Sequence, residues 1–301
     1  MRAITVVGNI QADVVVRPGD VLPPPGGDLR VDDIAVRAAG AAANTALTLR
    51  SLGAPVRMVG TLGDDDLGTH LRAELASHGL DGQVLVQPGT RTGTSVCFEA
   101  PDRDRAFLTF LGGLEAFTED VVPDDALAAD LVLLCGYFCL PALRGEPTRR
   151  LLERVHHAGG TTLFDCGWDV ADWPASTLRE LDVVLPLVDV FLPNADEVCG
   201  LSGVRDPQRA SEMLRDRSGG WVVTKLGADG CVAAGPGAET LAVRAPRVEV
   251  SDTTGAGDAF NAGVLLGLAV GLGWEGALRT AVRVASEVVS RPSHARFPAR
   301  G

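Results

Sequence analysis

The residues best suited to chemistry lie in one stretch, SDTTGAGDAFNAGVLLGLAVG, which covers residues 251–271. We expect the preceding run RVEV to be a strand and the long run of small apolar residues to be a buried helix. Gly255 and Gly257 permit positive φ, and they leave no Cβ atom over the turn. The N–H groups of Gly255, Ala256 and Gly257 would then surround one point at the start of a helix, which favours an anion.

Asp258 follows this turn directly, and its negative charge would repel an anion held there. Such a placement makes sense if a proton must be removed at the same point, because a carboxylate can act as the general base for an attacking hydroxyl. The alternative is an ordinary acidic residue in the first turn of a helix, which the helix dipole favours.

Two parts of the sequence resemble the signatures of the PfkB, or ribokinase-like, carbohydrate kinases. DTTGAGDAF, residues 252–260, resembles the C-terminal signature, and AGAAANTALTLRSLG with the following VRMVGTLGDDDLG resembles the N-terminal one, with Ala39 in place of its first glycine. The resemblance implies a kinase that transfers the γ-phosphoryl group of ATP to a primary hydroxyl of a small sugar. Asp258 would be the catalytic base, with the amides of Gly255, Ala256 and Gly257 around the transferred group.

The resemblance also implies a sugar site near the N-terminus. Asp13, just beyond the first expected strand, corresponds to an acidic residue that bonds sugar hydroxyls. Gly40 would let the backbone approach the ligand closely, and the amide of Asn44 can both donate and accept. The alternatives are a solvated turn for Asp13 and a helix surface for Asn44.

Nucleotide and metal residues are expected in the C-terminal half. Asn194 and Glu197 match an NxxE motif that would orient water around Mg²⁺, although Asn followed by Glu three residues later is also a capping box. Lys225, the single lysine of the chain, would either neutralise an ATP phosphate or be a partly exposed residue at a strand end. The resemblance implies that the nucleotide contacts Asn194, Lys225, Gly227, Gly230, Gly255 and Gly257. It also implies a site for a monovalent cation, expected to be K⁺, at Asp252 and Thr254.

The elements that must position these residues alternate between strand and helix. Strand-like runs at 3–8, 130–136, 161–167, 188–194 and 221–227 are separated by helical segments, which is typical of a mostly parallel sheet. Four alternating runs of antiparallel type, within about 12–37 and 93–111, suggest a separate small sheet. We therefore expect an α/β fold: one ribokinase-like domain over residues 1–301, built as a three-layer α/β/α sandwich with a small β-sheet lid. The lid is also expected to provide the contact of a homodimer.

Composition narrows the function further. The net charge of −12 argues against nucleic-acid and anionic-membrane partners, and no apolar run is long enough to span a bilayer. No glycine precedes a lysine, so a GxxxxGK[ST] phosphate loop is excluded. The six cysteines have no metal-ligand spacing, and we expect reduced thiols in a cytoplasmic protein.

The sequence leaves the acceptor open. Tyr137 and Phe138 could flank a sugar or a nucleobase, and a nucleobase there would make the protein a nucleoside kinase. Arg103 and Arg105 could meet a carboxylate or phosphate of the substrate, or they could form a solvated turn. From another class, the chain could bind a sugar without turnover, as a regulator. The intact Asp258 favours an enzyme.

Overall fold

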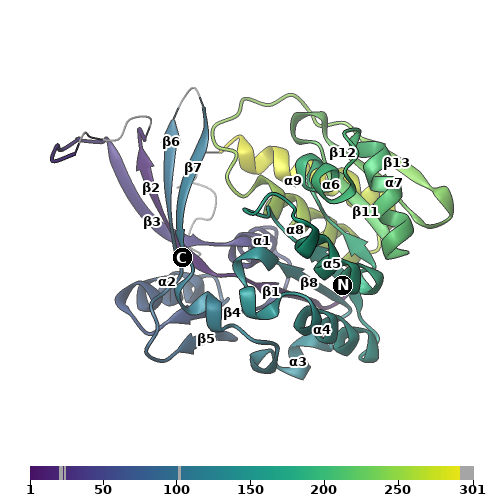
Figure 1. The fold of residues 1–301 in the computed structure, drawn as a ribbon, viewed down its shortest axis with the longest axis horizontal. Helices are drawn as coiled ribbons and strands as arrows, with labels where there is room; N and C mark the ends of the chain where they lie inside the picture. The colour runs from purple at the N-terminus through teal and green to yellow at the C-terminus, as the bar shows by residue number, and fades with distance from the viewer. Residues whose placement is uncertain (20–22, 24, 101–102, 292–301) are drawn as a thin grey trace.

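The structure is a computed structural model, and it describes residues 1–19, 23, 25–100 and 103–291 of the 301-residue chain. A nine-stranded sheet runs through the body of the molecule in the order β13-β12-β11-β10-β9-β8-β1-β4-β5 (Figure 1). All neighbours from β11 to β5 are parallel, whereas β12 and β13 are antiparallel at one edge. The strands are β1 Ile4–Gly8, β4 Arg57–Gly63, β5 Val84–Gln87, β8 Leu131–Cys135, β9 Thr161–Asp165, β10 Val190–Phe191, β11 Trp221–Lys225, β12 Cys231–Ala234 and β13 Thr240–Val243.

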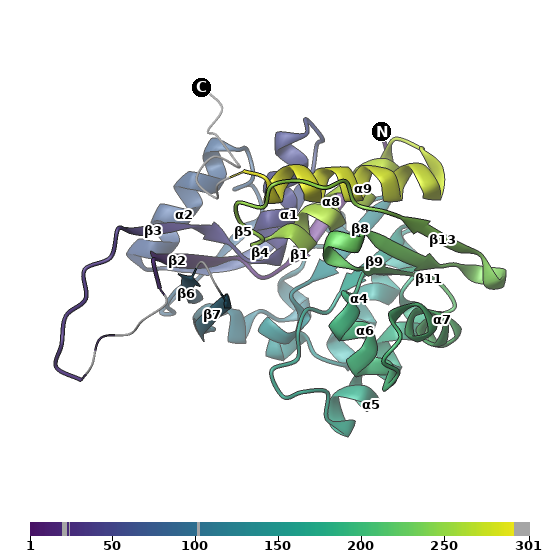
Figure 2. The ribbon, with the colours of Figure 1, turned by 90° about the horizontal axis from the view of Figure 1, so that it is seen from above.

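Helices cover both faces of this sheet, because successive side chains of its buried strands point to opposite sides. Val6 belongs to one apolar core and Val7 to the other, and Leu133 and Leu134 divide in the same way. Figure 2 shows the three layers from above. The helices on one face are α1 Ala41–Ser51, α2 Asp66–Ser77, α8 Ala256–Ala269 and α9 Gly273–Val289; those on the other are α3 Asp124–Leu127, α4 Glu146–His157, α5 Ala175–Val184, α6 Ala195–Ser202 and α7 Pro207–Ser218.

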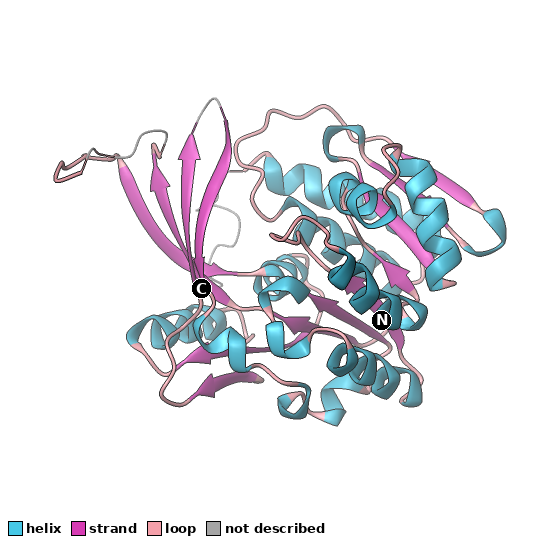
Figure 3. Cartoon of the chain, viewed as in Figure 1, coloured by secondary structure: helices cyan, strands magenta, loops and turns pink. Residues whose placement is uncertain are grey.

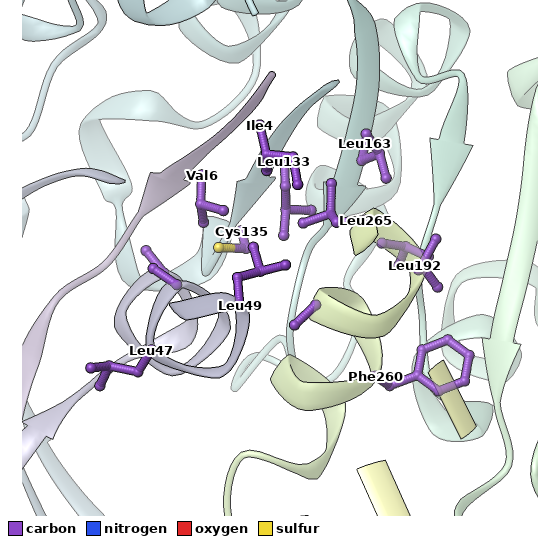
Figure 4. Packing of buried hydrophobic residues seen from close by; sticks show 14 of the residues in the cluster. Ile4, Val6, Leu47, Leu49, Leu133, Cys135, Leu163, Leu192, Phe260 and Leu265 are labelled. Carbon is purple, nitrogen blue, oxygen red and sulfur yellow. The ribbon is translucent and has the colours of Figure 1, made fainter. Parts of the chain in front are cut away.

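The core on the α1 and α8 side explains why α8 is apolar nearly all round. Leu47 and Leu49 of α1, Leu265 of α8 and Cys135 of β8 lie together in it (Figure 4). The other side of α8 packs closely on α9: a Cβ atom on Gly263 would lie 2.4 Å from Cα of Ala281, and one on Gly267 would lie 2.4 Å from Cα of Ala277. Helix α8, which carries the DTTGAGDAF signature, is therefore fixed between the sheet and α9.

A second, four-stranded sheet projects from one side of this body (Figures 1 and 3). Its order is β3-β2-β6-β7, with β2 Gln11–Arg17, β3 Asp33–Ala39, β6 Thr94–Ala100 and β7 Arg103–Phe110. The prediction that all its pairs are antiparallel is wrong, because β2 and β6 are parallel. Both strands enter from the large sheet, where the Ala12 N–H donates to the carbonyl of Gly93 at 2.8 Å, so they run outward in the same direction.

The expected strand at residues 247–250 is also absent, since this segment has no regular secondary structure. It follows the edge strand β13, and Val248 and Val250 are exposed there. The segment reaches α9, where the N–H of Ser251 donates to the carbonyl of Val289 at 2.8 Å. Helix α8 is therefore entered from an extended loop. No helix in the described part of the chain is long and apolar enough to span a membrane.

Candidate active site

The carboxyl ends of four adjacent parallel strands meet under the start of α8. Gly136 follows β8, Asp165 ends β9, Asn194 lies just beyond β10, and Lys225 ends β11. Ligands of open α/β sheets bind at such strand ends. Here the strand ends and α8 enclose a cavity of about 750 Å³, whose walls include all four of these residues, Gly257 and Asp258.

The turn into α8 has the predicted glycine geometry. Gly255 adopts the left-handed conformation at φ 70°, and the helix begins at Ala256. The first-turn amides of Gly257 and Asp258 have no helical carbonyl one turn earlier, which leaves donors at the helix N-terminus. The Ala256 N–H, in contrast, donates to the carbonyl of Thr253 at 3.2 Å, so the turn itself uses one of the three amides assigned to the anion site.

Asp258 lies beside this turn and contacts α1. Its Oδ2 accepts a 2.8 Å hydrogen bond from the side-chain amide of Asn44, and its carbonyl accepts one from Thr45 Oγ1 at 3.3 Å. Burial raises the pKa of Asp258 to about 7, with a further contribution from the negative charge of Asp165, while Asn44 and Lys225 act in the opposite direction. The carboxyl is therefore able to exchange a proton near neutral pH.

Lys225 forms a buried ion pair that the sequence did not indicate. Its Nζ lies 2.8 Å from Oδ2 of Asp165, and the two side chains are 11% and 9% exposed. The same Oδ2 accepts from the amide of Asn261 on α8, and Oδ1 accepts from the N–H of Gly167 at 3.1 Å. Lys225 thus ends β11 with most of its side chain covered, and its role toward an ATP phosphate stays a prediction. Asp165 was missed, although a charged residue at the end of the apolar run TTLFD is an available signal.

Asn194 and Glu197 form the capping box at the start of α6. The Asn194 N–H donates to Oε2 of Glu197 at 2.9 Å, the Asn194 amide donates to Oε1 at 2.8 Å, and the Glu197 N–H donates to the Asn194 side chain at 2.9 Å. Burial raises the pKa of Glu197 to about 7, and Asp165 adds to the shift. Both residues also line the cavity, so they can cap α6 and face a ligand at the same time.

This donor set fits Mg²⁺ held through water. Glu197 and Asn194 offer oxygen atoms at the cavity wall, and carboxylate oxygens can accept more than one hydrogen bond. Among residues 1–19, 23, 25–100 and 103–291, no three His, Cys, Asp or Glu side chains are placed to bind a metal directly. Mg²⁺ commonly keeps several waters and is bound through one or two carboxylates together with substrate phosphates.

Asp13 and Gly40 lie at the junction of the two sheets. Asp13 is 5% exposed; its Oδ1 accepts from the amide of Gln11 at 3.3 Å, and its Oδ2 lies 3.9 Å from Arg37 on β3. Gly40 has φ 95°, and a Cβ atom there would lie 2.4 Å from the carbonyl oxygen of Asn9, so close backbone packing requires glycine. The negative charge of Asp13 is the smallest of the causes that raise the pKa of Asp258.

Other predicted residues are placed as follows. Gly227 and Gly230 form the turn after β11 on the cavity wall. The buried Asp252 accepts the N–H of Thr254 at 2.8 Å just before α8. The far wall is formed by Val248, Val250, Val282, Ala285, Ser286 and Val289, and the Ser286 hydroxyl donates to the carbonyl of Val282 at 2.8 Å.

Tyr137 does not reach this cavity. It is fully buried in the opposite core, where its hydroxyl accepts from the N–H of Gly145 at 2.7 Å and bonds Glu180. The prediction that Tyr137 flanks a base or sugar is therefore wrong, since its ring packs edge-on against Phe138 and Phe164. The side chains of Arg103 and Arg105 lie outside the described part of the structure.

Comparison with known proteins identifies the family. The profile described as pfkB family carbohydrate kinase matches residues 1–299. The chain belongs to this family. It is 34% identical over 248 residues to the aminoimidazole riboside kinase of Salmonella typhimurium, which covers 79% of this chain and 76% of that protein. The predicted family and reaction class are confirmed: this pfkB-family protein is a phosphotransferase acting on a hydroxyl group.

Two solved structures support the fold of this pfkB-family kinase. A ribokinase from Thermotoga maritima gives a TM-score of 0.83 at 24% identity, covering 100% of this chain and 97% of that one. A ribokinase from Arabidopsis thaliana, complexed with ribose and ATP, gives a TM-score of 0.80 at 26% identity, covering 98% of this chain and 97% of that one. The predicted ribokinase-like α/β/α fold with a smaller sheet is confirmed.

Proposed function

We propose that this kinase transfers the γ-phosphoryl group of ATP to a primary hydroxyl of a small sugar of the ribose or fructose kind. The observation that carries the proposal is the place of Asp258, whose half-buried carboxyl group lies in the first turn of α8 beside the glycine turn. A proton acceptor and a set of anion-binding amides thus adjoin one point. Phosphoryl transfer needs both groups there.

The reaction then proceeds in one displacement. The Asp258 carboxylate takes the proton of the acceptor hydroxyl, the hydroxyl oxygen forms a bond to the γ-phosphorus, and the bond from that phosphorus to the bridging oxygen breaks to release ADP. The amides of Gly255, Ala256 and Gly257 stabilise the charge on the transferred group. Ala256 does so if its turn bond to Thr253 opens on binding.

The acceptor is held at the junction of the two sheets. Asp13 accepts hydrogen bonds from sugar hydroxyls, Gly40 brings the backbone close, and Asn44 bonds a hydroxyl while it holds Asp258. Arg37 provides one positive charge at this end, but it lies 3.9 Å from Asp13, which reduces its attraction for an acidic acceptor. A neutral sugar with vicinal hydroxyls therefore fits better than a sugar phosphate.

ATP occupies the cavity between the strand ends and α9. The phosphates lie toward Asn194, Lys225 and Gly257 on the cavity wall and toward Gly255 in the adjoining turn. The nucleoside lies along Gly227, Gly230 and the apolar wall. Asn194 and Glu197 hold Mg²⁺ through water, and the ion supplies charge neutralisation to the phosphates when it is bound. Asp252 and Thr254 would hold a monovalent cation, for which K⁺ is the expected ion.

The four-stranded sheet serves as the lid and as the contact of a homodimer. Its site-facing side carries the buried Asp13 and Cys97. Its other side carries a continuous row of apolar residues, since Val36 pairs with Val14, Val14 with Val96, and Val96 with Leu108. Leu108 is 66% exposed, which suits burial against a second copy of the chain. We propose a single domain that acts in the cytoplasm, without nucleic acid or membrane as partner.

A riboside is the second candidate acceptor, because a relative 34% identical to this chain is a riboside kinase. The base of such an acceptor would have to contact residues other than Tyr137, which is buried in the core.

The test is an acceptor screen with Mg²⁺-ATP in which ADP formation is measured. It compares ribose, fructose, 2-keto-3-deoxygluconate, fructose 1-phosphate, adenosine, inosine and cytidine. We expect a free pentose or ketose to give the highest kcat/KM. Deoxy analogues should lose about 1–3 kcal/mol of transition-state binding, because they leave a buried polar group unpaired. A nucleoside that leads by tenfold would favour a riboside as the acceptor, and the absence of ADP formation with every acceptor would overturn the proposed function.

A further inference from the structure

The ion pair between Asp165 and Lys225 is built from strands that are not neighbours. Asp165 ends β9 and Lys225 ends β11, with β10 between them in the sheet. The backbone of Lys225 is fixed independently, because its N–H donates to the carbonyl of Pro193 at 2.9 Å. The side-chain pair is therefore not needed to hold β11 in place, and its position above the strand ends calls for another explanation.

Every oxygen of Asp165 is committed. Oδ2 accepts from Lys225 at 2.8 Å and from the Asn261 amide, and Oδ1 accepts from the Gly167 N–H at 3.1 Å. Asn261 is also 3.4 Å from the ammonium through its own Oδ1. The ammonium group is thus held from two sides, by a strand end and by the helix that carries Asp258.

The place where the ammonium is held is specific. A Cβ atom on Gly257 would lie 3.5 Å from Nζ of Lys225, so the charge lies against the backbone of the second residue of α8. Lys225, Asp165 and Asp258 all line the same cavity. A buried ion pair is seldom more stabilising than apolar side chains of similar volume, so its occurrence on a cavity wall points to a role toward a ligand.

We infer that Asp165 is a positioning residue, which fixes the ammonium group of Lys225 beside Gly257 in the first turn of α8 so that it meets the transferred phosphoryl group. The inference rests on the proposed kinase function. Without Asp165, the flexible lysine side chain would still attract the phosphates of ATP, but it would no longer be held at the point where charge develops.

The kinetic test uses Asp165→Asn, with Asp216→Asn as the matched control. Asp216 lies on α7 with a side chain 70% exposed, and its replacement removes the same charge from the surface. We expect Asp165→Asn to lower kcat by about tenfold to a hundredfold, while KM for ATP stays within about threefold. A decrease of this size is similar to or smaller than the one caused by removing one preorganised hydrogen-bond donor. In a Lys225→Met background the same change should cost less than about twofold, because residues that act through one another are not additive.

The single lysine gives a readout that does not depend on activity. Selective ¹⁵N-lysine labelling produces one side-chain ammonium resonance, that of Lys225, and its protons should exchange slowly with water while the pair is intact. We expect Asp165→Asn to accelerate this exchange and Asp216→Asn to leave it unchanged. If Asp165→Asn does not fold, Asp165→Glu replaces it in the test. This variant keeps the charge but moves it by one methylene group, and it should also lower kcat, by a smaller factor.

The outcomes separate the inference from the proposed function. Unchanged kcat and unchanged exchange in folded Asp165→Asn would overturn the inference, and so would equal losses in the presence and absence of Lys225. A wild-type protein that phosphorylates no acceptor would instead overturn the proposed function. A parallel rise in KM for ATP, with kcat unchanged, would assign the pair to ground-state nucleotide binding and contradict the positioning role.

Discussion

The side-chain amide of Asn44 donates a 2.8 Å hydrogen bond to the carboxylate of Asp258, and this bond joins helices α1 and α8 across 214 residues of sequence. It links the two signature segments of the chain directly. Asn44 lowers the pKa of Asp258, whereas burial and Asp165 raise it. The pair therefore contributes both to the position of the proposed base and to its protonation.

Replacement of Asp258 by Asn should lower kcat by about 10²–10⁴, the usual contribution of a general base. The amide keeps the shape of the side chain, so KM for the acceptor should change little. Steady-state rates of ADP formation measure the effect, with Asp216→Asn as control, since this exposed aspartate lies on α7 and does not line the cavity. Turnover near the wild-type rate would refute the assignment of the base.

The pH dependence follows from the raised pKa of Asp258, which is about 7. Only the deprotonated carboxylate accepts a proton, so kcat/KM for the acceptor should be level above that pH and should fall about tenfold per unit below it. Asn44→Ala removes a bond that favours the charged form, and the pKa should rise further. The acid limb should then move to higher pH. A limb near pH 4 in wild type, or a shift to lower pH in the variant, would contradict this account.

Glu197→Gln should raise the Mg²⁺ concentration needed for half-maximal rate, because one carboxylate no longer orients metal-bound water. Glutamine is compatible with a capping box, so the start of α6 should persist. Circular dichroism tests whether the helix persists, and the dependence of the rate on Mg²⁺ concentration tests the metal role. Asp196→Asn, an exposed neighbour on the same helix, is the control. Identical titrations for Glu197→Gln and wild type would leave Glu197 with its capping role alone.

The phosphoryl donor should be discriminated weakly by its base. The wall expected to face the base is made of valine and alanine, and the hydroxyl of Ser286 is already bonded to the Val282 carbonyl. Little side-chain hydrogen bonding then distinguishes adenine from guanine. We expect kcat/KM for ATP and GTP to differ by less than about a hundredfold, and Val282→Asn to widen the gap. Preference for ATP by several thousandfold would indicate backbone recognition of the base.

The apolar row of the small sheet should form the homodimer contact. Replacing Leu108 by Lys places a charge at the end of this row on the edge strand β7, where the side chain is 66% exposed, and the variant should sediment as a monomer. Thr240→Lys on the edge strand β13 is a control at an exposed position on the far side of the large sheet. A wild-type protein that sediments as a monomer at all accessible concentrations would exclude this role of the sheet.

Much of the fold could be predicted from the sequence, because buried parallel strands such as LVLLC and TTLFD are continuous apolar runs. The glycine turn and Asp258 could be located for a similar reason, since local rules fix helix starts. The pairing of Lys225 with Asp165 could not, because it depends on the order of β9, β10 and β11 in the sheet. The parallel β2–β6 pair and the burial of Tyr137 were missed because both depend on long-range packing.

The close contact of Gly263 and Gly267 with α9 fixes the distance between the start of α8 and the cavity wall formed by α9. Helix α8 carries Asp258 at one end, α9 carries Val282 and Ser286 on the far wall of the cavity, and the two helices touch through backbone with no long side chain between them. The distance from the nucleoside to the transferred phosphorus is therefore set by two rigid backbones. A donor should be selected by its length, so that a triphosphate reaches the acceptor, a diphosphate stops short, and the identity of the base matters less than the number of phosphates.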